Sequence, residues 1–142
     1  MIKDFCKFMA LKAANNEKEW TEWETKEYNE EMYFGWCFIQ YEFFTQWSEI
    51  KKYAGSKGIK IIGDIPIYVS LDSCDVWSNK KQYCLDEEGK PKLVAGVPPD
   101  YFSADGQLWG NPLYDWDEMK KDGYKWWSDR IKHMATMFDA IR

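Results

Sequence analysis

Histidine, paired cysteines and basic surface charge are all scarce in this sequence. His133 is the only histidine, which weakens the case for a Ser–His or Cys–His mechanism. The four cysteines, Cys6, Cys37, Cys74 and Cys84, form no C-x-x-C pair and have no histidine beside them. They fit neither a zinc site nor a disulfide framework, so we expect free buried thiols. We predict neither a metal nor a cofactor.

Long apolar runs and an excess of positive charge are also missing. No apolar stretch is long enough to cross a bilayer, and the first residues, MIKDFCKFMALK, lack the apolar region and cleavage site of a signal peptide. The net charge is -5 and the pI is about 5.0. These features argue against nucleic acid or an anionic membrane as the main partner and predict a cytoplasmic protein.

Aromatic residues are abundant, at 18% of the chain with nine tryptophans. Many of them gather in residues 94–116, VAGVPPDYFSADGQLWGNPLYDW, together with three prolines and three glycines. The turn dipeptides in this stretch predict an ordered loop without helix or strand. Its mixture of rings and amides suits a polar ligand that has a flat apolar face, such as a sugar. The alternative is a long loop held to its own domain by aromatic anchors.

Three helices are predicted from apolar residues spaced three and four apart. Residues 4–14 form the first, with Asp4 as its N-cap. Residues 28–54 form the second, which is apolar on two faces and is therefore expected to be wedged between neighbouring elements. Residues 123–138 form the third, capped by Asp122.

The strongest strand signal is residues 58–69, GIKIIGDIPIYV. Its nearly continuous isoleucine run is typical of a central parallel strand covered on both faces. Residues 139–142 read as the opening of another strand, and residues 70–122 lie between as a long insertion. Within it, residues 83–94 predict a hairpin around the acidic turn Asp86–Gly89. Because loops at the carboxyl ends of parallel strands carry active sites, we assign the insertion to the functional face.

Aspartates are the candidate acids of this face. A glycosidase mechanism needs two carboxyl groups, one of them with a raised pKa. Nothing in the spacing selects a pair, and caps and turns are the commoner use of such aspartates. The candidates are Asp64, Asp72, Asp75, Asp100, Asp105 and Asp115.

Five blocks of the sequence resemble the 4-alpha-glucanotransferase family, also called amylomaltase or disproportionating enzyme. They are FCKFMALK, FIQYEFFTQW, GIKIIGDIPIYV, LDSCDVW and the stretch VAGVPPDYFSADGQLWGNPLYDW. The resemblance implies an α/β fold that is part of a (β/α)8 barrel of the α-amylase type, with a long loop insertion after one parallel strand. It also implies a retaining transfer. An aspartate attacks an α-1,4-glucan, a glutamate protonates the leaving oxygen, and a sugar hydroxyl then collects the glycan.

The resemblance assigns substrate binding to several residues of the long loop. Tyr101, Phe102 and Ser103 match a loop that arches over the cleft. Gln107 and Trp109 match contacts on the donor side. The implied partner is a maltodextrin or another starch-derived α-1,4-glucan.

Residues outside the loop tip also carry implied roles. Asp64 matches the aspartate at the end of the third barrel strand, which binds or supports rather than attacks. Asn111 lies close to the donor contacts, and Arg142 matches the arginine just before the nucleophile in the pattern R-I-D-H. For Asp72 and Asp75 we expect structural roles.

The resemblance also makes residues 1–142 a single internal fragment of a catalytic barrel. It would comprise a helical part (1–57), a barrel strand (58–69), a substrate-binding loop insertion (70–122), and a helix with the start of the next strand (123–142). The catalytic carboxylates would lie beyond the last residue, so the fragment contains no catalytic residue and is expected not to catalyse alone. Three alternatives stay open: a maltodextrin-binding module without catalysis, a structural fragment whose open strand edges pair with a second copy, and an amylase-like hydrolase, which the block GQLWGNPLY disfavours.

Overall fold

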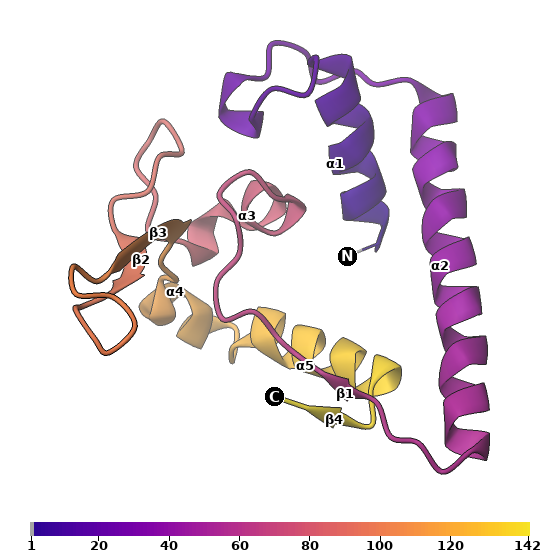
Figure 1. The fold of residues 1–142 in the computed structure, drawn as a ribbon. Helices are drawn as coiled ribbons and strands as arrows, with labels where there is room; N and C mark the ends of the chain where they lie inside the picture. Colours follow the sequence, from indigo (N-terminus) through magenta and orange to yellow (C-terminus); the bar gives the residue numbers. More distant parts are fainter. Residues whose placement is uncertain (1) are drawn as a thin grey trace.

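A computed structural model describes residues 2–142. Its longest helix, α2, runs along one side with α1 beside its upper half, and α5 lies below α1, beside the lower half of α2 and next to the short strands β1 and β4 (Figure 1). The strands β2 and β3 project at the opposite end (Figure 1). The elements are α1 (Ile2–Ala14), η1 (Trp20–Glu22), α2 (Glu30–Ser56), β1 (Ile62–Gly63), α3 (Cys74–Ser78), η2 (Lys80–Gln82), β2 (Val94–Val97), β3 (Gln107–Pro112), α4 (Trp116–Lys121), α5 (Lys125–Met137) and β4 (Ala140–Ile141).

The first helix starts earlier than the sequence predicts. α1 begins at Ile2, so Asp4 lies in its first turn, where a carboxylate favours the helix dipole, rather than at the cap. The helix ends at Asn15, whose buried side chain holds the chain that follows. Its amide donates to the carbonyls of Leu11 and Thr25, and its oxygen accepts from the backbone N–H groups of Glu24 and Thr25.

The second helix is where predicted, but it is not wedged on all sides. Its N-cap is Asn29, whose side chain accepts from two backbone N–H groups of the first turn. α1 and α5 cover one side, and the Trp47 indole donates to the carbonyl of Met137 at 3.0 Å. α2 nevertheless has no buried residue, and Phe34 and Phe38 are 63% and 62% exposed. The part of the helix around Phe34 and Phe38 is therefore largely open to solvent in the structure of residues 2–142.

The predicted strand 58–69 is too long. Only Ile62 and Gly63 form β1, because β4 offers just two residues to pair with, in the parallel register Ile62↔Ala140 and Gly63↔Ile141. The isoleucine run is not covered on both faces either, since Ile62 is 70% exposed. The start of a strand at residues 139–142 is confirmed as β4.

The stretch 94–116 does contain strands, contrary to the sequence-based expectation. β2 and β3 pair antiparallel, with an irregular register between Val94 and Gly96. A Cβ at Gly96 would lie 2.6 Å from the carbonyl oxygen of Gln107, so glycine allows the two strands to approach. The prolines and glycines therefore mark the ends and the irregularity of a hairpin rather than the absence of strands.

The acidic turn at Asp86–Gly89 is confirmed as the tip of a small hairpin. The Asp86 N–H donates to the carbonyl of Lys90, and Leu85 and Pro91 form an antiparallel bridge. Gly89 has a φ of +84°, which a side chain would disfavour.

The main core is formed largely by the insertion 70–122, packed against α1, η1 and α5. It joins α1, α3 and α4 to α5, so residues 70–122 are a folded layer rather than an open loop. Its buried members are Phe8, Trp20, Val76, Tyr83, Tyr114, Met119 and Trp126. The structural role expected for Asp72 fits its contacts, because it accepts hydrogen bonds from the Lys12 ammonium and the Trp20 N–H.

The third long helix begins two residues later than predicted. α5 starts at Lys125, after Tyr124 in a left-handed conformation with a φ of 59°. Asp122 still acts near the start of the helix, since its carboxylate accepts from the Lys125 N–H at 3.0 Å. No helix within residues 2–142 is long and apolar enough to span a bilayer.

Candidate functional site

The loop between β2 and β3 presents two aromatic rings to solvent. Tyr101 is 97% exposed and Phe102 is 87% exposed, and their rings meet edge to face at 5.7 Å. Rings that are exposed at a loop tip instead of packed below it are available to a ligand. The alternative in which these rings anchor the loop to its own domain is therefore wrong for Tyr101 and Phe102.

The loop tip is ordered by its own hydrogen bonds. Asp100 accepts from the N–H groups of Phe102 and Ser103, each at 2.9 Å, and its own N–H donates to the carbonyl of Ser103. The Ser103 hydroxyl donates to the carbonyl of Gly106 at 2.7 Å. Gly106 has a φ of +74°, and a Cβ there would lie 2.6 Å from the carbonyl oxygen of Val97. The tip therefore has one favoured shape, which glycine makes possible.

At the base of the hairpin, Trp109 is half exposed and held from two sides. Its indole N–H donates to the side-chain oxygen of Gln107 at 2.9 Å, and its ring lies 6.3 Å from that of Tyr68. Gln107 and Trp109 are both on β3, two residues apart, so they share one face of the strand. The pair offers an indole face together with an amide.

Two hydrogen bonds tie this hairpin to the segment that follows β1. The Asn111 amide donates to the carbonyl of Val69 at 2.9 Å, and the Tyr114 hydroxyl donates to the carbonyl of Ile67 at 2.8 Å. Tyr114 is buried among aromatic rings, and burial raises the pKa of its hydroxyl to about 12, so it stays protonated as a donor. The base of the hairpin is thus fixed relative to the carboxyl end of β1.

Asp64 and Arg142 meet at the carboxyl ends of the two parallel strands. Each directly follows its strand, and the guanidinium of Arg142 donates to both carboxylate oxygens, at 2.9 and 3.4 Å. The hydrogen bond from Arg142 holds the pKa of Asp64 below its ordinary value. Asp64 is therefore ionised at neutral pH and unsuited to donate a proton. Both side chains are mostly exposed, which leaves them open to a ligand.

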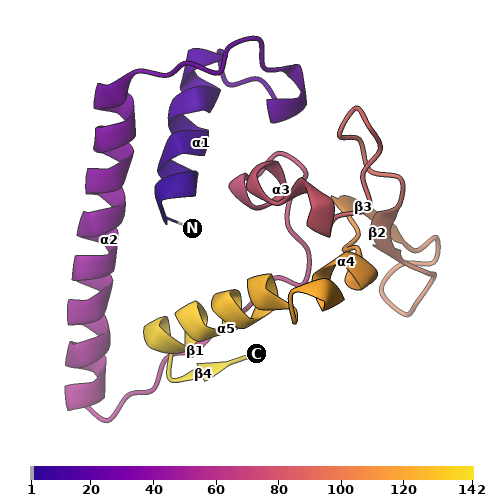
Figure 2. The same cartoon turned by 180° about the vertical axis from the view of Figure 1, so that it is seen from behind.

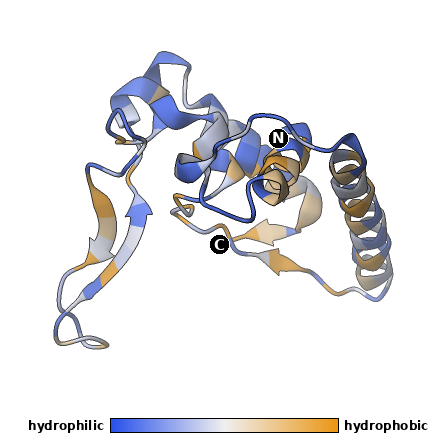
Figure 3. Cartoon of the chain, turned by 90° about the horizontal axis from the view of Figure 1, so that it is seen from above, coloured by the Kyte–Doolittle hydropathy of each residue, from blue (hydrophilic) through white to orange (hydrophobic). Residues whose placement is uncertain are grey.

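The two parts of the site lie toward the same side of the molecule. Seen from above, the arrows of β1 and β4 point toward the side from which the β2–β3 hairpin projects (Figure 3), and the same direction is visible in Figure 1. The structure therefore joins Gln107, Trp109 and Asn111 to the segment after Asp64, and it pairs Asp64 with Arg142. Tyr101 and Phe102 contact each other at the tip. None of the hydrogen bonds described above links the tip to Asp64 or Arg142.

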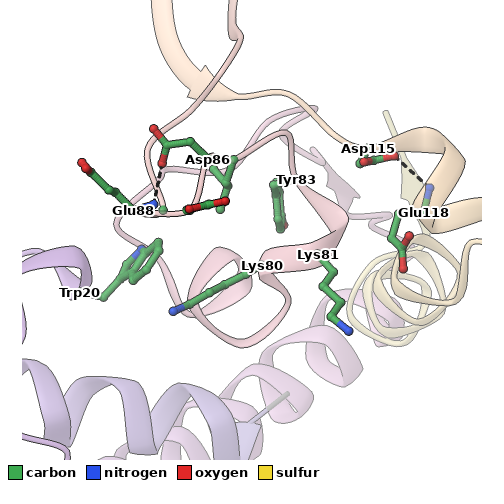
Figure 4. A pocket seen from close by; sticks show the side chains of 11 residues that line it. Trp20, Lys80, Lys81, Tyr83, Asp86, Glu88, Asp115 and Glu118 are labelled. Atoms are coloured by element: carbon green, nitrogen blue, oxygen red, sulfur yellow. Dashed lines mark hydrogen bonds between the residues drawn. The ribbon is translucent and has the colours of Figure 1, made fainter.

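A cavity of about 500 Å³ lies elsewhere, beside the acidic hairpin. Trp20 and Lys80 form one side, with the ammonium 4.3 Å from the center of the indole ring, and Asp115 and Glu118 lie on the other (Figure 4). Of the residues that the sequence analysis considered for a site, it contains only the candidate acid Asp115, which accepts from the Glu118 N–H at the start of α4. Its carboxylate and ammonium groups line a polar surface hollow.

Two residues of the site were not singled out from the sequence for their roles. Tyr68, which faces Trp109, is hidden in the isoleucine run, and only its position after Pro66 hints at a different role. Asp100 was considered as an acid, yet its carboxylate is occupied by backbone N–H groups of the loop. Within residues 2–142, no group of three potential ligands is arranged to hold a metal ion. The arrangement is an exposed surface made of rings, amides and one ion pair, groups that suit a polar ligand with a flat apolar face.

The chain is similar to known proteins along its whole length. The sequence profile described as 4-alpha-glucanotransferase matches residues 1–142. The 4-alpha-glucanotransferase of Clostridium butyricum is 46% identical over 155 residues, which cover 99% of this chain and 32% of the relative. The chloroplastic/amyloplastic 4-alpha-glucanotransferase of Solanum tuberosum is also 46% identical, over 99% of this chain and 27% of its own length.

Two solved amylomaltase structures also match this chain. The amylomaltase from Streptococcus agalactiae in complex with acarbose matches 99% of this chain and 31% of its own, with a TM-score of 0.86 and 43% identity. The amylomaltase from Corynebacterium glutamicum shares the fold with a TM-score of 0.76 at 20% identity. The chain thus spans about a third of the length of the relatives it matches. A match of the family profile to all 142 residues shows that the chain belongs to the 4-alpha-glucanotransferase family.

Proposed function

We propose that this chain is the glucan-binding part of a 4-alpha-glucanotransferase. The enzyme would transfer α-1,4-glucan segments to sugar acceptors by a retaining double displacement. The observation that carries the proposal is the exposure of Tyr101 and Phe102 on an ordered loop whose base is tied to the segment after Asp64. A loop that is both rigid and aromatic can hold a polymer of flat rings at low entropic cost.

We further propose that β1 and β4 are adjacent strands of a (β/α)8 barrel of the α-amylase type. Their parallel pairing, with α5 leading into β4, supports this arrangement. In such a barrel the carboxyl ends of the strands carry the active site. Asp64 and Arg142 follow those ends directly.

The proposed roles follow from the exposed ring surface and the unused hydrogen-bonding groups of each side chain. Tyr101, Phe102 and Trp109 offer exposed ring area to the flat faces of glucose units. Gln107 holds the indole of Trp109 and keeps its own amide N–H groups for sugar hydroxyls. A lid of rings over bound sugar would also limit the entry of water, which favours transfer to a sugar acceptor over hydrolysis.

The polar members of the site would orient the glucan and the loop. Ser103 donates within the loop and retains its lone pairs for a sugar hydroxyl, while Asn111 donates to Val69 and keeps its amide oxygen free for the same purpose. Asp64 would accept from sugar hydroxyls, and Arg142 would hold Asp64 ionised. We assign the bond-breaking aspartate and the proton-donating glutamate to other parts of the enzyme, since its relatives are about three times as long as the match.

A graft tests the activity. Residues 1–142 would replace the matching segment of the 4-alpha-glucanotransferase of Clostridium butyricum, and the product would be incubated with maltotriose. We expect glucose and longer maltodextrins, with activity reduced at least tenfold by Trp109→Ala. Tyr53→Ala, an exposed change on α2, is the matched control and should leave the activity unchanged. A folded graft that turns over maltotriose equally well with and without Trp109 would refute the assigned role.

Direct binding tests the site without catalysis. Acarbose is bound by the Streptococcus agalactiae relative according to its description, and it can be titrated into the 142-residue chain while tryptophan fluorescence is followed. We expect saturable quenching, and Trp109→Ala should weaken binding by about tenfold, the cost of truncating one central aromatic contact. Leu108→Ala is the control, because Leu108 is 80% exposed but faces the other side of β3. Saturable quenching with no turnover by the graft would instead favour a maltodextrin-binding module.

A structural fragment that pairs with a second copy is the remaining alternative. The unpaired edges of β1 and β4 and the exposed aromatic face of α2 favour it. We propose that the 142-residue chain, studied alone, self-associates through these surfaces, and light scattering would report a dimer or larger species. Phe38→Lys should then restore a monomer, whereas a monomeric unmodified chain would contradict this proposal.

Two further proposals concern partners and location. With a net charge of -5, we propose neither nucleic acid nor a membrane as a partner. A cytoplasmic location stays a prediction, and the plant relative from Solanum tuberosum is described as chloroplastic/amyloplastic.

A further inference from the structure

Two of the four cysteines lie together where α1 packs on α2. Cys6 is fully buried on α1, and Cys37 is half-buried on α2. α1 and α2 pack against each other here. Burial and the neighbouring Cys37 thiol raise the pKa of Cys6, and Cys37 also raises the pKa of Tyr33 on its own helix, so the three side chains lie close together. The two helices run antiparallel side by side in both opposite views (Figures 1 and 2). The chain therefore brings two thiols from distant parts of its sequence close together.

The surroundings hold this pair in place. The neighbouring residues Phe5 and Trp36 pack edge to face, with ring centers 5.8 Å apart, so the helices are locked at the level of the thiols. A disulfide requires Cα atoms within about 7 Å of each other and little strain. Neighbouring thiols between two packed helices are placed to meet this condition.

We propose that Cys6 and Cys37 form a reversible disulfide that staples α1 to α2 when the chain meets a low-molecular-weight disulfide such as oxidised glutathione. This inference is independent of glucan binding. The disulfide would join α1 to α2 and would involve neither the loop tip nor the Asp64–Arg142 pair.

The chemistry is two successive thiol–disulfide exchanges. Cys37, the more accessible thiol, loses its proton to solvent and attacks one sulfur of oxidised glutathione. The glutathione S–S bond breaks, a Cys37–glutathione disulfide forms, and one glutathione thiolate leaves and takes up a proton. The Cys6 thiolate then attacks the Cys37 sulfur, and the second glutathione leaves. Two protein thiols are oxidised, and one glutathione disulfide is reduced to two thiols.

The remaining cysteines provide a contrast within the same chain. Cys74 contacts Ser78 rather than another thiol, and Cys84 lies near the carbonyl of Tyr114. Burial and contact with Cys37 raise the pKa of Cys6 to about 11, so little Cys6 thiolate exists at neutral pH. Closure of the protein disulfide is therefore expected to be slower than formation of the mixed disulfide at Cys37.

Oxidation should have a measurable effect on stability. The link would close a loop over residues 6–37, which includes the irregular segment around η1. Constraining a loop of this size in the unfolded chain raises the thermal midpoint on the order of 10 °C. Reduction with dithiothreitol should reverse this change.

The test equilibrates the 142-residue chain with oxidised glutathione, alkylates the remaining thiols and maps peptides by mass spectrometry. We expect a peptide that links Cys6 to Cys37, two alkylated thiols at Cys74 and Cys84, and a higher melting temperature that dithiothreitol reverses. Cys37→Ser should abolish the linked peptide and the shift, whereas the double variant Cys74→Ser/Cys84→Ser should retain both.

Mapping the unmodified chain keeps the test valid even if a serine variant unfolds. The proposal would be overturned if all four thiols were alkylated after equilibration, if stable glutathione adducts replaced the link, or if Cys6 or Cys37 paired with Cys74 or Cys84.

Discussion

The tether between the β2–β3 hairpin and the segment after β1 can be tested by removing one oxygen atom. Tyr114→Phe keeps the buried ring but removes the hydroxyl that donates to the carbonyl of Ile67 at 2.8 Å. The ring contacts with Tyr68, Tyr83 and Trp126 are retained, so the change removes only the interactions of the hydroxyl, which are the bond to Ile67 and an interaction with Arg130. It also leaves a carbonyl oxygen in a partly buried position without its donor.

We expect the variant to lose about 1–2 kcal/mol of unfolding free energy. A typical buried hydrogen bond contributes about 1 kcal/mol, and an acceptor left without a partner adds to the loss. For a chain of this size the melting temperature should fall by about 3–6 °C. Asn111→Ala removes the second tether, to Val69, and should cost about 1 kcal/mol. Because the two bonds fix the same short segment, their effects should be non-additive by about 0.5 kcal/mol or more.

Urea unfolding of the four members of this double-mutant cycle, followed by far-UV circular dichroism, measures the effect. Tyr53→Phe is the matched control, since Tyr53 is 66% exposed on α2 and its hydroxyl should contribute less than 0.5 kcal/mol. The same samples would be titrated with acarbose, and Tyr114→Phe should weaken binding several-fold because it loosens the support of Trp109. Stability and acarbose affinity equal to those of the control would refute the tether.

Three further changes probe other parts of the structure. In urea unfolding, Gly106→Ala should lower the unfolding free energy by at least 2 kcal/mol and Gly110→Ala by about 1 kcal/mol. Both glycines have positive φ, but only at Gly106 would a Cβ also meet a backbone oxygen. Equal losses would contradict the close contact at Gly106. Asn15→Ala should lower the unfolding free energy by about 2–4 kcal/mol, because four hydrogen bonds are lost at a buried site. A loss below about 0.5 kcal/mol would contradict this and show that water replaces the four hydrogen bonds. The pKa of Asp64 lies below its ordinary 3.8, so any stability that the ionised Asp64 provides is present above pH 3.8 and is lost as the pH falls through the lowered pKa. Carboxyl NMR should show the pKa of Asp64 rising in Arg142→Gln, and an unchanged pKa would contradict the ion pair.

The predictions that depended on local periodicity came closest to the structure. α2 and α5 were predicted to within two residues, because their apolar spacing and caps are encoded within each segment. Composition left open whether the rings of Tyr101 and Phe102 serve a ligand or anchor the loop, and the structure shows that both are exposed. The signature blocks, rather than periodicity, indicated the family, because they record loop residues that have no regular pattern.

The errors arose where structure depends on a partner element. The isoleucine run was predicted as a long strand, but pairing requires a neighbour, and β4 supplies only two residues. Phe34 and Phe38 on α2 are exposed within residues 2–142, although the sequence of this helix is typical of one packed on two sides. The β2–β3 hairpin was missed because glycines at 96 and 110 and the register irregularity obscure the alternation of a strand. Tyr68 and Tyr114 joined the site only through contacts across more than 30 residues.

The central claim is that an aromatic hairpin, fixed to the end of a parallel strand, holds the glucan. Amide hydrogen exchange of the 142-residue chain with and without a long maltodextrin tests it most directly, because it reports which segments the sugar protects. We predict slower exchange in residues 98–111 and 64–69, with no change along α2. Protection confined to α2 or to the acidic hairpin at 83–91, with residues 98–111 unaffected, would contradict it.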